Sequence, residues 1–191
     1  MIRAGHNDRT LVADILTKSF DANQSVNYLV KQDAKRVERV RALMEYSFDV
    51  CRKFGEVYLS EDKKACALIL YPDQKRTSLQ SIGLDVKLIL RSIGITNISK
   101  ALQRETKIKK IQPKQAMTYL WFIGVYPEYQ NLGLGTNLLK NIIEESRQKN
   151  RPLFLETSTL KNIPWYTKFG FKVYSELDLS YKLFFLKKDI A

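Results

Sequence analysis

The chain has 191 residues, of which 45% are hydrophobic and 27% charged, and its formal net charge at pH 7 is +12. This composition is typical of a globular protein, and the length predicts a single domain, residues 1–191, with a sizeable core. We expect a cytoplasmic protein without a membrane partner, because no apolar run approaches the ~20 residues that cross a bilayer and the N-terminus has no apolar signal segment.

Histidine and cysteine usage excludes several kinds of catalytic centre. His6 is the single histidine, so we expect neither a Ser-His-Asp triad nor a histidine-ligated metal, and we predict no metal site. Cys51 and Cys66 are not spaced as metal ligands. We expect both to be buried or half-buried thiols in a reducing compartment.

The positive charge has two interpretations. One is nucleic-acid binding, but the sequence carries no signature of a nucleic-acid module. The other is a basic surface, part of which faces a polyanionic cofactor and raises its rate of association. We therefore predict no specific nucleic-acid partner.

The N-terminal part predicts a short strand and two helices. Residues 1–4 favour a strand, and Asn7 or Asp8 can cap a helix whose apolar positions continue to Phe20. A second helical pattern spans about 33–53 and has one apolar and one charged face, which is typical of an amphipathic helix packed on a core.

A β-hairpin follows the second helix. Gly55 fits the helix end, and residues 57–59 and 65–71 are two strand-like runs joined by a polar turn. Pro72 ends the second run because proline has no N–H for a sheet ladder.

Residues 73–117 interrupt the pattern of strands. An unstructured loop of this length is improbable inside a compact domain. Apolar residues at helical spacing predict one helix near 79–94, and a second, basic segment near 97–108 favours another.

The most informative stretch runs from a strand at about 119–126, through Pro127, to the glycine-containing turn QNLGLG and a helix that begins near Thr136. Glycine lets backbone N–H groups point inward, and a helix N-terminus carries partial positive charge. Residues 130–136 therefore predict an anion site that suits a pyrophosphate.

Two common pyrophosphate motifs do not fit this turn. A P-loop requires Gly-Lys-Ser/Thr, whereas Gly135 precedes Thr136 and Asn137. A dinucleotide-binding turn requires a third glycine where this chain has Leu138, and it should close the first strand of a βαβ unit.

The C-terminal part predicts a strand at 152–157 and a short helix at 162–169 that Gly170 ends. Two last strands are predicted near 171–176 and 180–187.

Two motifs together resemble a known family. Gln130-x-x-Gly133-x-Gly135, after a strand that ends in Val-x-Pro, is similar to the acetyl-CoA loop of the GNAT family of N-acetyltransferases. The second motif of that family has its counterparts at Asn162, Tyr166, Gly170 and Phe171. The resemblance covers about residues 117–175 and is closest to the branch that resembles puromycin N-acetyltransferase.

The resemblance implies an α/β (α+β) fold. Its expected form is a central mixed, mostly antiparallel sheet of six to seven strands, with a splay between the fourth and fifth and helices on its flanks. The helical insert, at about 73–117, would lie between the third and fourth strands.

The resemblance also implies acetyl-CoA as cofactor. The turn would hold the pyrophosphate, and the open edge of the preceding strand would pair with the pantetheine amides as an added strand does. The residues expected in these roles are Ile123, Gly124, Val125, Gln130, Asn131, Leu132, Gly133, Leu134, Gly135 and Thr136.

Roles in the chemistry follow from the same resemblance. Asn162 would bond the pantetheine or the thioester side, or else cap a helix, and Tyr166 would protonate or stabilise the leaving thiolate. For the general base, Glu156 is the first candidate because it ends the strand beside the splay, and Glu128 is the second. Either could act through a water, or the amine could lose its proton to the solvent. His6 is not expected to act.

The expected activity is that of an N-acetyltransferase, an acyltransferase of the EC 2.3.1 type that acetylates a primary amine by direct attack in a ternary complex. A small-molecule acceptor is the first choice. A protein or peptide acceptor, and a non-catalytic acyl-CoA-binding module, are the alternatives. The acceptor, the role of the basic insert and the choice between monomer and homodimer stay open.

Overall fold

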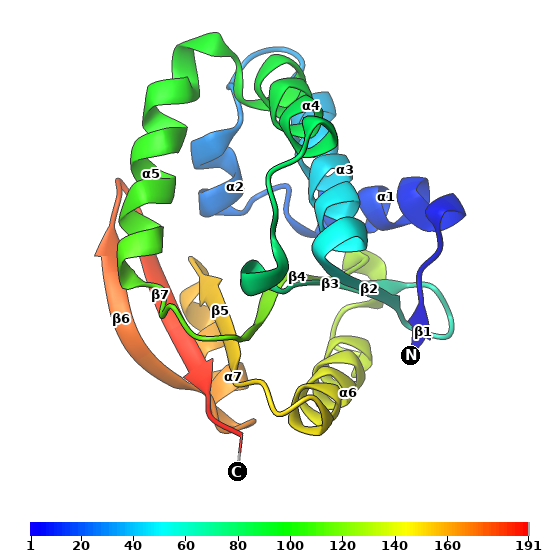
Figure 1. Cartoon of the computed structure of the whole chain (residues 1–191). Helices are drawn as coiled ribbons and strands as arrows, with labels where there is room; N and C mark the ends of the chain where they lie inside the picture. Colours follow the sequence, from blue (N-terminus) through cyan, green and yellow to red (C-terminus); the bar gives the residue numbers. More distant parts are fainter. Residues whose placement is uncertain (191) are drawn as a thin grey trace.

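The computed structural model describes residues 1–190 and is built around one mixed sheet (Figure 1). Its strand order is β1-β2-β3-β4-β5-β7-β6, and all neighbouring pairs are antiparallel except β4–β5. The strands are β1 (Ile2–Arg3), β2 (Gly55–Leu59), β3 (Ala65–Leu70), β4 (Thr118–Val125), β5 (Leu153–Thr157), β6 (Lys172–Asp178) and β7 (Lys182–Lys188).

Seven α-helices accompany the sheet within residues 1–190. They are α1 (Arg9–Ser19), α2 (Gln24–Leu29), α3 (Arg36–Phe54), α4 (Leu79–Leu88), α5 (Ile98–Ile111), α6 (Leu134–Gln148) and α7 (Ile163–Thr167). Every helix of the sequence analysis is present, and α2 is an additional helix in the segment between the first two. None of these helices is both long and apolar enough to cross a membrane.

The splay that the family resemblance implies is present. β4 and β5 pair at two positions, Thr118 with Leu153 and Tyr119 with Phe154. Beyond these pairs β4 stays bonded to β3 as far as Val125, while β5 stays bonded to β7 as far as Thr157. The twist of the sheet therefore carries the two strands apart, and one edge of β4 is left open.

The two faces of the sheet pack against different helices (Figure 1). On one face α1 and α3 cover a core that includes Phe48, Leu68 and Phe122. On the other face α6 and α7 pack on a second core that includes Leu139 and Leu155. Because side chains alternate along a strand, each position of β4 and β5 is assigned to one of these faces.

The insert between β3 and β4 is helical, as expected. A π-helical turn, Ile89–Ile93, follows α4, and α5 then runs beside β6 and β7 (Figure 1). Ile108 of α5 packs with Leu183 and Phe185 of β7. The insert therefore forms a wall at one end of the sheet rather than a detached arm.

One local prediction, the cap of the first helix, needs correction. Asp8 precedes α1, but its carboxylate accepts the N–H of Gly5 at 2.8 Å instead of capping α1, because residues 6–8 already form a 3₁₀ turn. Asn7 lies inside that turn and cannot cap either. Gly55 ends α3 as predicted, and its φ of −175° is extended. Glycine is needed there because an added Cβ would lie 2.0 Å from the carbonyl oxygen of Ile69.

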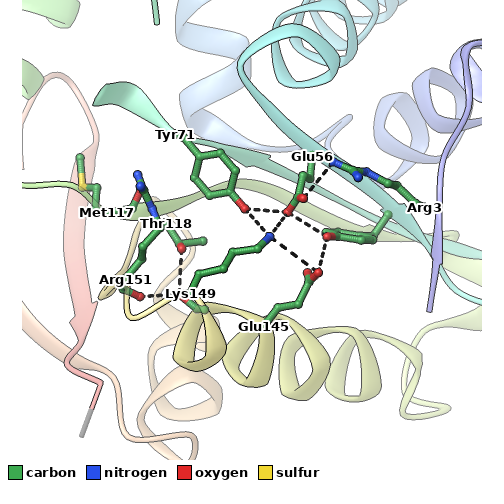
Figure 2. A network of polar contacts seen from close by, with 10 residues as sticks. Arg3, Glu56, Tyr71, Met117, Thr118, Glu145, Lys149 and Arg151 are labelled. Carbon is green, nitrogen blue, oxygen red and sulfur yellow. Dashed lines mark hydrogen bonds and ion pairs between the residues drawn. The ribbon is translucent and has the colours of Figure 1, made fainter. Parts of the chain in front are cut away.

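A polar network fixes the C-terminal half of α6 to the sheet (Figure 2). The Tyr58 hydroxyl donates to Glu145 at 2.7 Å, and Lys149 bonds both the carboxylate of Glu56 and, at 2.8 Å, the hydroxyl of Tyr71. Burial disfavours the charged form of Glu56, but the hydrogen bonds that it accepts from Lys149, Tyr71 and Tyr58 still hold its pKa below the usual value. Since α6 is held at this end, the position of its N-terminus is defined as well.

Candidate active site

The turn between β4 and α6 has the features of an anion site. Gly133 and Asn131 have left-handed φ values of +83° and +64°, and α6 begins directly after Gly133, two residues earlier than predicted. The first helical bond runs from the Asn137 N–H to the Gly133 carbonyl, so the N–H groups of residues 134–136 have no intrahelical acceptor. A Cβ on Gly133 would meet nothing within 4 Å, so the turn faces open space.

The open edge of β4 leads directly to this turn. The N–H of Tyr126 bonds to Lys64 on the β3 side, and because bonding directions alternate, the backbone groups of Ile123 and Val125 face the splay. The Val125 carbonyl already accepts the hydroxyl of Ser19 at 2.7 Å. Gly124 is needed where α1 crosses β4, because an added Cβ would lie 2.9 Å from Leu16.

Asn162 and Tyr166 stand on the α7 side of the splay. Asn162 is at the N-cap position of α7, but its side chain makes no capping bond, so the capping alternative is not seen. Tyr166 is buried against Phe171, with ring centroids 5.5 Å apart, and its hydroxyl has no hydrogen-bond partner within residues 1–190. Burial raises the pKa of this phenol.

Trp165 connects this segment to the anion turn and was missed by the sequence analysis. Its indole N–H donates to the Thr136 hydroxyl at 3.2 Å, and its ring packs on Tyr166 at 4.7 Å. The available signal was the position of Trp165 between Pro164 and Tyr166. This contact ties Tyr166 to the first turn of α6.

Glu156 lies on the opposite face of the sheet from Tyr166. It shares the face of Phe154, whereas Tyr166 packs in the second core with Leu155. Its carboxylate accepts the Tyr119 hydroxyl at 2.5 Å and the Gln112 amide at 2.7 Å. Burial raises its pKa, and these two hydrogen bonds and the positive charge of Arg104 oppose that rise.

The partners of Glu156 come from elements that sequence reasoning did not connect. Tyr119 is on β4, and Gln112 is the residue that directly follows α5. The only signal for Tyr119 was an aromatic residue early in the central strand, and Gln112 had none. The insert therefore reaches the candidate catalytic carboxylate.

The remaining candidates lie apart from this arrangement. Glu128 is in the exposed Pro127–Tyr129 turn and makes no hydrogen bond through its side chain within residues 1–190. His6 is exposed before α1. Cys51 and Cys66 are buried, and burial raises the pKa of both thiols, so neither is favoured as a nucleophilic thiolate.

Comparison with known proteins agrees with this geometry. Residues 93–171 match the model of the acetyltransferase (GNAT) family. The Corynebacterium glutamicum protein described as histone acetyltransferase HPA2 and related acetyltransferase is similar over 100% of this chain and 95% of its own, with a TM-score of 0.72 and 16% identity. An N-acetyltransferase of Staphylococcus aureus is similar over 97% and 98%, with a TM-score of 0.60 and 18% identity.

A third solved structure, a putative acetyltransferase of Desulfovibrio desulfuricans, covers 100% of this chain and 98% of its own, with a TM-score of 0.56 and 15% identity. At these identities the structures show a shared fold. Residues 93–171 thus match the acetyltransferase (GNAT) family, and the whole chain has the fold of the acetyltransferases named above, including the splayed sheet and the glycine turn. Members of this family generally use acetyl-CoA.

Proposed function

We propose that this protein transfers the acetyl group of acetyl-CoA to a primary amine of a small molecule, by direct attack within a ternary complex. The observation that carries the proposal is the open edge of β4. It connects the anion turn at one end to Tyr166 and Glu156, which lie on opposite faces of the sheet. A thioester in the splay would therefore have a hydrogen-bond donor on one side and a carboxylate on the other.

The residues present fit coenzyme A. The turn offers backbone N–H groups that precede the first helical bond, and their environment is open. In this proposal the pyrophosphate is held by the turn residues Gln130, Asn131, Leu132, Gly133, Leu134, Gly135 and Thr136.

The pantetheine arm would pair with the edge formed by Ile123, Gly124 and Val125. Ile123 offers its N–H and carbonyl and Val125 its N–H, because the Val125 carbonyl is already bonded to Ser19. Asn162, whose side-chain amide is not used for capping, would bond the arm from the α7 side.

Tyr166 is assigned as the donor to the leaving group. Acetyl-CoA would supply an activated acyl carbon when bound, and the thiolate of coenzyme A would be the leaving group. Because burial raises the pKa of Tyr166, the phenol stays protonated and donates a hydrogen bond to the sulfur as negative charge develops there. Its hydroxyl has no hydrogen-bond partner within residues 1–190, so no existing hydrogen bond must be broken before it donates to the sulfur.

Glu156 is assigned as the general base. An amine attacks only after it loses a proton, and a carboxylate whose pKa is raised by burial is a better base near neutral pH than an exposed one. Tyr119 and Gln112 hold the carboxylate in one orientation. Glu128, exposed in its turn, is the weaker candidate.

A small acceptor is favoured by the elements around Glu156. Arg104 of α5 bonds both Ser25 of α2 and Tyr181 of the β6–β7 turn, at 2.7 and 3.0 Å. These bonds join the helical insert to α2 over the same face as Glu156. Because α5, α2 and the β6–β7 turn are linked to one another on this side, the space beside Glu156 suits a compact amine better than an extended peptide.

Thiol release with a panel of primary amines tests the proposal, together with calorimetric binding of acetyl-CoA. We expect binding, amine-dependent thiol release and intersecting initial-rate patterns. Parallel patterns would instead point to an acetyl-enzyme. Binding of acetyl-CoA without turnover on any amine would support the alternative of a non-catalytic acyl-CoA-binding module. Absence of binding would refute acetyl-CoA as the cofactor.

A further inference from the structure

Within residues 1–190, Arg104 differs from every other half-buried arginine in having no carboxylate partner. Burying the charged guanidinium group of an arginine is unfavourable unless a carboxylate or another anion pairs with it. Five of the six half-buried arginines have such a partner: Arg9, Arg36, Arg39, Arg41 and Arg151. Arg104 is the sixth, and it forms no ion pair within residues 1–190.

The contacts of Arg104 are neutral. Its Nε donates to the Tyr181 hydroxyl at 3.0 Å and its Nη2 to the Ser25 hydroxyl at 2.7 Å. A guanidinium has five N–H donors, so three remain for another acceptor. The two hydroxyls hold the group in place without neutralising its charge.

Arg104 also faces the acceptor side of the candidate site. It lies on the inner side of α5, one turn before buried Ile108 and two turns before Gln112, which bonds Glu156. Its charge acts on Glu156, where it opposes the effect of burial on the carboxylate. The Tyr28 and Tyr181 rings stack edge to face beside it, with centroids 5.2 Å apart.

We propose that Arg104 binds an anionic group, a carboxylate or phosphate, that the acceptor carries in addition to its amine. The inference rests on the proposed function, because it takes the face of Glu156 as the acceptor side. Glu156 would receive the amine end and Arg104 the anionic end of one molecule. The planar guanidinium suits a two-oxygen acceptor, which it binds through parallel N–H bonds. The substrate class is therefore an amino acid or another amine with an acidic group.

Steady-state kinetics with matched acceptors tests this proposal. L-Phenylalanine is compared with 2-phenylethylamine, and O-phosphoethanolamine with ethanolamine, so that each pair differs by the anionic group. We expect the anionic member of at least one pair to have a kcat/KM at least tenfold higher, and the pair that responds identifies the anion. Equal or better use of both neutral amines would overturn the proposal.

Variants then assign the effect to Arg104. Arg104→Ala is expected to raise KM for the preferred anionic acceptor ten- to hundredfold, with a small change for its neutral counterpart, and Arg104→Lys should restore part of the loss. Lys107→Ala, on the exposed side of the same helix, is the control for loss of a nearby positive charge. If Arg104→Ala raises KM equally for the anionic and the neutral acceptor, Arg104 only holds α2 and α5 together, and anion binding is refuted.

A binding measurement separates this inference from the proposed function. Titration of 3-phenylpropanoate, which has the carboxylate but no amine, is followed by NMR for the wild type and for Arg104→Ala. Loss of binding in the variant supports the anion site even if no amine is acetylated. Equal binding by both proteins overturns the anion site even if acetyl transfer is observed.

Discussion

Two side chains on opposite faces of the sheet, Tyr166 and Glu156, define the candidate chemistry at the scale of single residues. Tyr166 is a buried phenol whose hydroxyl has no partner within residues 1–190, and Glu156 is a carboxylate held by two donors. Neither arrangement is needed for the core. The Tyr166 hydroxyl oxygen is not among the fully buried oxygens that lack a partner, so it is accessible to a ligand, which fits a role toward the cofactor.

Replacing Tyr166 by phenylalanine removes the hydroxyl and keeps the ring against Phe171. We expect kcat to fall about 10²-fold or more, since the donor to the leaving sulfur is lost, while the affinity for acetyl-CoA stays nearly unchanged. Stopped or continuous thiol-release assays and calorimetry measure the two quantities. A normal kcat would remove Tyr166 from the mechanism.

Glu156 leads to a prediction about pH. A general base acts when deprotonated, so the rate should rise with pH through its pKa, which burial places above the ordinary value. The Gln112 amide stabilises the charged form, so Gln112→Leu should raise that pKa further and move the acidic limb of kcat/KM to higher pH. Gln115→Leu, at an exposed position four residues from the end of α5, is the control. An unmoved limb in Gln112→Leu would argue against Glu156 as the base.

At the scale of elements, two glycines differ in the space available for a Cβ atom. Gly55 opens β2 where a Cβ would overlap the backbone of Ile69 at 2.0 Å, whereas Gly83 is inside α4 with nothing within 4 Å of an added Cβ. The first glycine is required by a close approach of two strands. The second makes no such contact and only lowers helix propensity.

Alanine at these two positions should therefore have opposite effects on stability. Gly55→Ala is expected to lower the free energy of unfolding by about 3 kcal/mol, because β3 must shift to make room. Gly83→Ala should raise it by about 0.5–1 kcal/mol, because alanine is the better helix former. Urea unfolding of both variants measures the difference, and equal effects would contradict the register of β2 and β3.

At the scale of the whole molecule, the network around Glu56 connects the sheet to the far end of α6 and so supports the anion turn. Lys149 is the cation of that network (Figure 2). Because the pKa of Glu56 is lowered in the folded protein, the network contributes stability above the unfolded pKa of the carboxylate. That contribution is lost as pH falls through the lower, folded pKa.

Lys149→Met should reveal this contribution. We expect the free energy of unfolding to fall by about 1–2 kcal/mol at pH 7. This value is moderate because Lys149 is partly exposed and its ion pair is screened by solvent. The difference in free energy of unfolding between wild type and variant should narrow as pH falls below about 4. Thermal or urea unfolding across pH measures it, and a gap that does not depend on pH would mean that Lys149 acts through packing alone.

The sequence by itself determined the features that depend on local chain chemistry. Gly133 and the helix after it predict an anion turn, because a left-handed backbone and unpaired helical N–H groups need only neighbouring residues. The strands, the helical insert and the order of the two family motifs were likewise readable, since hydrophobic period and turn residues act over short distances. Even here α6 begins at Leu134 rather than near Thr136.

Only the tertiary structure decided what surrounds the candidate chemistry. Glu156 meets Gln112 from the insert and Tyr119 from a neighbouring strand, and Arg104 meets Ser25 and Tyr181 from two further elements. These partners are 37 to 79 residues apart in the chain. No local pattern encodes such contacts, because they arise when the sheet twists and the insert packs across its end.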